Sequence, residues 1–189
     1  MKGWSNALTV IFAASLANPG IAFNANAADA CAPVRKAMDA HLKSERMKVR
    51  MLTSGQNSGE TEAMIVPEGM YIKLNEQWIK SPIASSREEI MKFADPGKVT
   101  LTDCKAVGRE AVDGAATAVY TYKGKVEGQK ESEGKIWIGN EDGLPHKAEV
   151  KSGSTLITQF ISHGAEIQAP KGGLELPAGI GNLIKGFMK

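Results

Sequence analysis

The sequence predicts an α+β domain dominated by antiparallel strands, and three observations lead to this prediction. In several runs between residues 47 and 161, apolar side chains alternate with polar ones. Such alternation is typical of half-buried antiparallel strands that present one apolar face. Turn-forming segments separate the runs, and the chain holds 20 glycines with only 6% aromatic residues. Helical spacing of apolar residues precedes the first run and follows the fourth.

The amino terminus is predicted to be a signal peptide covering residues 1–27. Lys2 supplies a positive start, residues 7–17 are apolar, and Ala25-Asn26-Ala27 has the small residues of a cleavage site. About eleven apolar-rich residues are too few to span a bilayer stably. We therefore expect cleavage after Ala27 and export to the periplasm. An uncleaved anchor or a core helix is the alternative interpretation.

The length and charge of the chain predict a single exported domain at residues 28–170. The roughly 160 residues left after cleavage can bury a sizeable core. A formal net charge of +2, with both signs interspersed along the chain, indicates no nucleic-acid partner. Three histidines and two cysteines without clustering predict no metal site, and no cofactor is expected.

Cys31 and Cys104 are the only cysteines, and an even pair in an oxidising compartment predicts a disulfide. The bond would join the start of the first helix to a central strand. Two free thiols are the alternative. An acylated Cys31 is disfavoured because Asp29 occupies the cleavage region. Without a Cys-x-x-Cys pattern, redox catalysis is not expected.

Two helices are predicted, one before the strands and one among them. The first begins near Pro33, which suits a first helical turn. Its apolar stripe is Val34, Ala37, Met38, His41 and Leu42. His41 is therefore interpreted as a packed or rim residue and not as a ligand. The second helix starts at the capping box Ser85-Ser86-Arg87-Glu88 and ends at Pro96-Gly97.

The stretch from Lys135 to Val150 is the sharpest hairpin signal. Two strand-like runs flank Asn140-Glu141-Asp142-Gly143, where Asp-Gly supplies the positive φ that closes a short turn. Pro145 cannot donate to the ladder, so the return strand is expected to pair late.

Within this hairpin, the spacing Trp-Ile-x-x-x-x-Gly-Leu-Pro from Trp137 to Pro145 resembles a signature of the periplasmic lipoprotein-carrier superfamily (LolA-type fold). Residues 108–120 resemble that superfamily more loosely, and residues 164–170 resemble its last edge strand. The resemblance implies a strongly curved antiparallel sheet, a half-open β-barrel, with both helices packed into its concave face. It also implies that this face binds acyl chains.

Given that resemblance, a set of apolar side chains is predicted to line the concave face. Methionine is frequent among them, and its unbranched, polarisable side chain adapts to ligands of variable shape. Ordinary core filling is the alternative, and a one-residue slip in register would exchange the two faces. The predicted lining residues are Met47, Val49, Met51, Met64, Met70, Ile72, Leu74, Trp78, Met91 and Phe93.

Residues 171–189 form a tail of different character. Its apolar positions, at helical spacing, are Leu176, Ile180, Leu183, Ile184 and Phe187. Glycines among them weaken an isolated helix. Three interpretations stay open: a frayed tail, a helix over the sheet edge or cavity mouth, or a helix on the membrane surface.

No catalytic pattern stands out, and no enzymatic activity is expected. The sequence holds no His-Glu-x-x-His, Gly-x-Ser-x-Gly or phosphate-loop motif. The leading hypothesis is a periplasmic carrier or binding protein for a hydrophobic ligand, with lipid or lipoprotein acyl chains as cargo. The alternative is an envelope-stress sensor or interaction module that contacts an envelope protein through a sheet edge. A stable envelope domain without a ligand is the third hypothesis.

Overall fold

The architecture is one open sheet with a single helix across it among the described residues. The computed structural model describes residues 30–55, 58–81, 99–126, 128 and 130–175. The elements are α1 (Ala32–Lys43), β1 (Met47–Ser54), β2 (Gly59–Val66), β3 (Gly69–Leu74), β4 (Gln77–Lys80), β5 (Val99–Val112), β6 (Ala115–Val126), β7 (Ser132–Gly139), β8 (Pro145–Ser152), β9 (Thr155–His163) and β10 (Leu174–Glu175).

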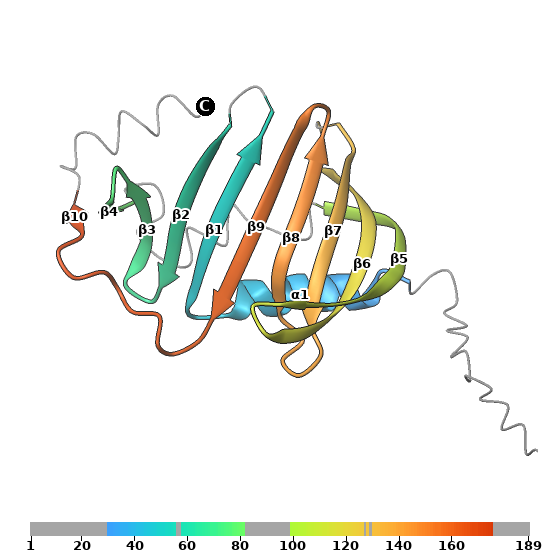
Figure 1. Cartoon of the computed structure of the whole chain (residues 1–189), viewed down its shortest axis with the longest axis horizontal. Coiled ribbons are helices and arrows are strands. Elements are labelled where there is room, and N and C mark those ends of the chain that lie inside the picture. The colour runs from blue at the N-terminus through green and yellow to red at the C-terminus, as the bar shows by residue number, and fades with distance from the viewer. Residues whose placement is uncertain (1–29, 56–57, 82–98, 127, 129, 176–189) are drawn as a thin grey trace, which may run out of the picture.

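The ten strands have the order β10-β4-β3-β2-β1-β9-β8-β7-β6-β5. Every neighbouring pair is antiparallel except β10 with β4. The sheet curves without closing, because β10 and β5 remain as its two edges (Figure 1). The curved antiparallel sheet predicted from the sequence is confirmed.

Short turns with left-handed residues join the strands. Asp113 and Gly114, between β5 and β6, have φ of 48° and 85°, a turn whose twist matches that of the flanking strands. Gly143 has φ of 68° between β7 and β8, as the hairpin motif predicts. Pro145 pairs with Ile138. A register shift separates this pair from the pair of Trp137 with Lys147, so the start of β8 pairs irregularly with β7.

The pairing register sorts side chains onto two faces. Met51 pairs with Gln159, Gln159 with Ala148, and Ala148 with Ile136, so these four side chains share a face. α1 packs against Ile136 and therefore covers part of that face. We call it the inner face, which is the concave side of the sheet, and its opposite the outer face.

The main core lies between α1 and strands β6 and β7. Val34 and Ala37 of α1 are 0% and 1% exposed and pack with Tyr122 and Ile136. The helical spacing of the sequence places these two residues on one side of the helix, as predicted. Fully burying a side chain of the size of Val34 or Ile136 contributes roughly 1.5–3 kcal/mol.

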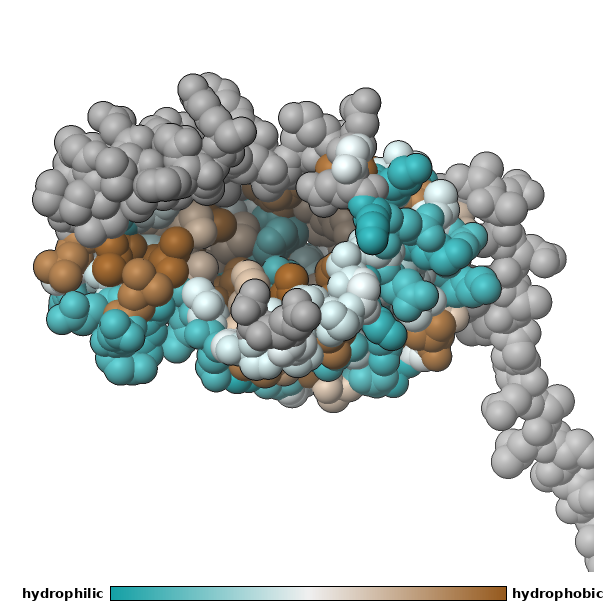
Figure 2. Space-filling model, turned by 90° about the horizontal axis from the view of Figure 1, so that it is seen from above, coloured by the Kyte–Doolittle hydropathy of each residue, from teal (hydrophilic) through white to brown (hydrophobic). Residues whose placement is uncertain are grey.

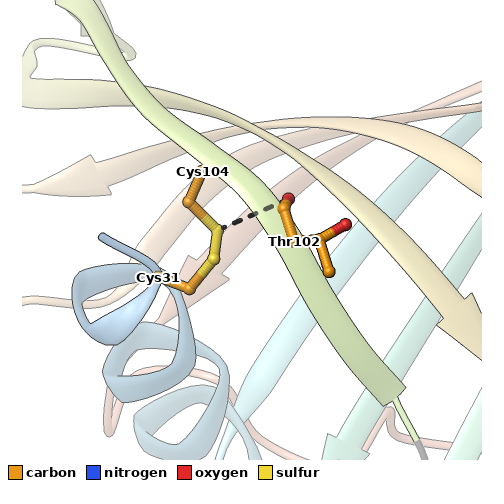
Figure 3. The surroundings of a disulfide bond; sticks show 3 residues. All are labelled: Cys31, Thr102 and Cys104. Atoms are coloured by element: carbon orange, nitrogen blue, oxygen red, sulfur yellow. Dashed lines mark hydrogen bonds between the residues drawn. A yellow bond between two sulfur atoms is a disulfide. The ribbon is translucent and has the colours of Figure 1, made fainter. Parts of the chain in front are cut away.

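A disulfide ties Cys31, the residue before α1, to β5, which confirms the predicted pairing, but β5 is an edge strand and not the central strand that was expected. The Cα atoms of Cys31 and Cys104 are 5.0 Å apart, and both residues are buried in the main core. Figure 3 shows the bond beside Thr102, whose carbonyl oxygen lies 3.8 Å from Cys104 Sγ. A disulfide sulfur has no hydrogen to donate, so this contact is one of packing.

The segment after β9 corrects the sequence prediction, because residues 164–170 form no edge strand. β9 already has β1 and β8 on its two sides, so the chain leaving it finds no adjacent free edge. The segment instead crosses the outer face, where Ile167 packs on Val66 and Tyr71. Arg46 Nη1 donates a hydrogen bond to Ile167 O at 2.8 Å and holds this crossing.

The edge position belongs to β10, which lies inside the segment predicted as a tail and pairs with β4. The predicted signal peptide (1–27), the second helix (85–94) and the remainder of the tail (176–189) lie outside the described residues.

Removing the disulfide should lower stability substantially. The bonded residues are 73 positions apart, and a loop of that size corresponds to about 4 kcal/mol in the chain-entropy model. We expect the Cys31→Ala/Cys104→Ala variant to lose about 2–4 kcal/mol of unfolding free energy in urea titrations. Reductant should destabilise the natural protein to a similar level. A reductant effect on the double variant would contradict this explanation.

Candidate functional site

The inner face of β1 to β4 carries no charged side chain. Register and alternation put every Lys, Arg and Glu of these four strands on the outer face. β9, next to β1, has no Lys, Arg, Asp or Glu on either face, and its terminal residue is His163. The inner positions of β1 to β4 are Met47, Val49, Met51, Thr53, Gly59, Thr61, Ala63, Ile65, Met70, Ile72, Leu74, Gln77 and Ile79.

The predicted lining residues of β1 and β3 meet on this inner face. β2 lies between the two strands and links them: Met47 pairs with Ile65, and Ile65 pairs with Met70. The residues brought together are Met47, Val49, Met51, Met70, Ile72 and Leu74. Sequence reasoning missed their neighbours Ala63, Ile65 and Ile79, although these follow the same alternation.

Met64 and Trp78 are on the outer face, contrary to their predicted place in the lining. Met64 pairs with Lys48 and packs against the cluster around Ile167, and Trp78 pairs with Lys73. Each has an apolar neighbour in the sequence, so alternation alone does not say which of the two faces inward. The predicted lining residues Met91 and Phe93 lie outside the described part of the chain.

Among the residues that the structure describes, the inner face is enclosed near α1 and open toward β4. Near α1, Ile136 and Ile138 are 2% and 8% exposed, whereas Met51 and Ile72 are only half-buried. Leu74, at the β4 side, is 53% exposed. Figure 2 looks along the strands into a hollow in the middle of the molecule, with hydrophobic residues gathered at one end. The β4 end of the inner face therefore offers apolar area that a ligand can remove from water.

Histidines from two distant parts of the chain meet where α1 ends. The rings of His41 in α1 and His163 in β9 pack edge to face with centroids 5.4 Å apart. His163 Nδ1 lies 3.0 Å from Ser44 Oγ, and its Nε2 lies 3.3 Å from the carbonyl oxygen of Pro145. No sequence pattern indicates this contact beyond the position of His41 on an apolar stripe.

Burial makes these histidines weak bases. Burial, together with the smaller effect of the nearby His163, lowers the pKa of His41 to about 4. Burial also lowers the pKa of His163, which the carbonyl of Pro145 partly offsets. The third histidine, His146, sits close by and pairs with Asp142, its Nε2 3.0 Å from Oδ2. At neutral pH the buried rings of His41 and His163 are therefore uncharged.

A second hollow, of about 520 Å³, is lined by many charged residues. It lies at the β5–β8 end, and most of its side chains belong to the outer face. These include Lys105, Lys123, Glu133, Lys135, Glu149 and Lys151. Within the described ranges, no cluster of three or more His, Cys, Asp or Glu residues could hold a metal ion. No described helix is both long and apolar enough to cross a membrane.

Comparison with solved structures shows which proteins have a similar architecture. LprF from Mycobacterium bovis matches 78% of this chain and 98% of its own, with a TM-score of 0.53 at 12% identity. The lipoprotein LppX of Mycobacterium tuberculosis matches 72% and 95%, with a TM-score of 0.48 at 16% identity. For a LolA superfamily protein from Nitrosomonas europaea the shares are 70% and 91%, the TM-score 0.28 and the identity 10%.

No protein-family model matches the chain, and no curated protein matches it in sequence. The structural likeness therefore establishes the fold alone. The fold is LolA-like, as the Trp137–Pro145 hairpin motif predicts.

The closed end of the inner face should be sensitive to one added methyl group. A Cβ at Gly134 would overlap the ring of Tyr122, which packs over it in the main core. We expect Gly134→Ala to cost about 1–3 kcal/mol of unfolding free energy. Gly124→Ala is the matched control, because its nearest contact would be an ordinary 3.5 Å to Ser132 Oγ. Equal losses in urea titrations of the two variants would contradict this packing.

Proposed function

We propose that the protein binds a hydrophobic ligand, a lipid acyl chain, on the open half of its inner face and carries it through the periplasm. One observation carries the proposal: β1 to β4 place all their charges on the outer face and none on the inner face. A sheet that faced water on both sides would have no reason to sort its charges in this way.

The driving force would be the transfer of apolar area out of water. Met51 and Ile72 are half-buried without a ligand, so their remaining area is available for contact. A chain of sixteen carbons gains on the order of 10 kcal/mol gross, at about 0.8 kcal/mol per methylene. Ordering of the chain and loss of its free motion reduce the net value. Methionines at 47, 51 and 70 fit a ligand of variable shape.

The proposal assigns the protein no catalytic role. The predicted signal peptide supports a periplasmic location, and lipoprotein acyl chains are one source of the ligand. Contact of the C-terminal tail with a membrane surface would bring the carrier to its donor or acceptor. A role as a protein-interaction module on the same fold is the competing proposal, and the experiments below separate the two.

Two neighbouring residues of β1 give a matched test of the binding face. Met51 faces inward and Leu52 faces outward, and both are half-buried. We expect Met51→Asn to weaken binding of the fluorescent fatty acid cis-parinaric acid at least tenfold, because it puts an amide into the apolar face. Leu52→Asn should bind within about twofold of the natural protein. Equal weakening in both variants, or no binding by the natural protein, would contradict the proposal.

Native mass spectrometry of protein purified from the cell envelope identifies the natural ligand. A co-purifying lipid supports the carrier. A ligand-free mass together with a stable protein partner supports the interaction module instead.

A further inference from the structure

α1 is held on the inner face by different means at its two ends. Its N-terminal end is bonded covalently to β5 through Cys31 and Cys104. Its last turn carries His41, whose ring packs on His163 of β9. Breaking the second contact would leave the helix held at its start by the disulfide and joined to β1 by residues 44–46, so its last turn could make a local movement away from the sheet.

The described residues around His41 offer no counter-ion for a protonated ring. Its Nδ1 is buried and makes no hydrogen bond within the described residues. The titratable groups of the elements facing it are His163 of β9 and, on the α1 side of β6, Tyr120 and Tyr122. No carboxylate contributes to its pKa. A charge on His41 would therefore be buried without a counter-ion.

The groups around His163 do not supply a counter-ion to His41 either. Its two ring nitrogens are hydrogen-bonded to the hydroxyl of Ser44 and to the carbonyl oxygen of Pro145. Asp142, the carboxylate that acts on His163, is already paired with His146. Arg46, in the connection to β1, adds positive charge and binds the carbonyl of Ile167.

From this geometry we infer that the His41–His163 contact is an acid-sensitive latch, which holds α1 over the inner face at neutral pH and releases its C-terminal end on acidification. His163 pairs with Met47, the buried first residue of the proposed binding face. The latch therefore borders the hydrophobic site, and release would open that site at this end. This regulatory role rests on the proposed function, whereas the helix movement itself does not.

The pH range in which the latch opens follows from the direction of the His41 pKa shift. The pKa of His41 is about 4 with the helix docked and 6.5 in its ordinary state, so the released form binds the proton better. The docked state is unaffected above pH 6.5 and loses stability as the pH falls from 6.5 toward 4. Between pH 6.5 and 4.5 the released-to-docked ratio should rise about 40-fold.

Hydrogen exchange of the full, disulfide-bonded chain tests the latch without any ligand. Peptides covering residues 37–46 should lose protection between pH 6.5 and 4.5, after correction for the intrinsic exchange rate at each pH. Peptides from β7 and β8 should stay protected. Unchanged protection of residues 37–46, or a simultaneous loss in every peptide, would overturn the inference.

His41→Gln removes the titrating group and should abolish the pH dependence of protection, whatever its effect at neutral pH. His41→Leu serves the same purpose if the glutamine variant does not fold. The matched control is His146→Gln, which should keep most of the acid response because His146 is already paired with Asp142. An acid response that persists in both His41 variants would refute the latch.

Release of cis-parinaric acid is measured separately. Binding at pH 7 that weakens at pH 4.5 in the natural protein, but not in His41→Gln, supports control of the site by the latch. An acid-released helix with no change in affinity would overturn that control and leave the carrier proposal intact. No binding at pH 7 would refute the carrier proposal alone.

Discussion

The cross-strand register is the constraint on which the rest of the molecule depends. A single row crosses the outer face from β7 to β4: Trp137, Lys147, Phe160, Arg50, Glu62, Lys73 and Trp78. Lys147 Nζ lies 4.1 Å from the centre of the Trp137 ring, and Lys73 pairs with Glu62 at 3.3 Å. Each such contact contributes only about 0.5–1 kcal/mol. A one-residue slip of β1, however, would turn its two cations toward the apolar face, which costs far more.

Sequence alone gave the elements and part of the site. Hairpins with Asp-Gly turns and single apolar residues at every second position, as in β1, determine both the strand and its inward face. Alternation does not place Met64 and Trp78, because each has an apolar neighbour in the sequence and only the pairing partners show which of the two faces inward. The His41–His163 contact could not be predicted, because it joins a helix to the end of the ninth strand through tertiary packing.

The two ends of the inner face differ in how much apolar side-chain area they enclose. The buried core, the disulfide and α1 all lie over β5 to β8, where side chains such as Ile136 are almost fully enclosed. The β1–β4 end keeps Met51 and Ile72 only half-buried. Segments with little enclosed apolar area are the ones that rearrange at low cost. A rigid end can thus hold the fold while the other end changes its contacts.

The shape of the outermost strands bears on how the protein behaves in a crowded compartment. β5 is a long edge, but its pairing with β6 shifts between Thr102 and Lys105 and again between Ala106 and Gly108. Asp103, between the first pair, adopts a left-handed φ of 54°. Bulges of this kind interrupt the row of free backbone groups that another chain would need for strand addition. At the opposite border the short β10 covers β4. Within the described residues, neither border of the sheet thus offers a long straight strand for a second copy, which disfavours lateral aggregation.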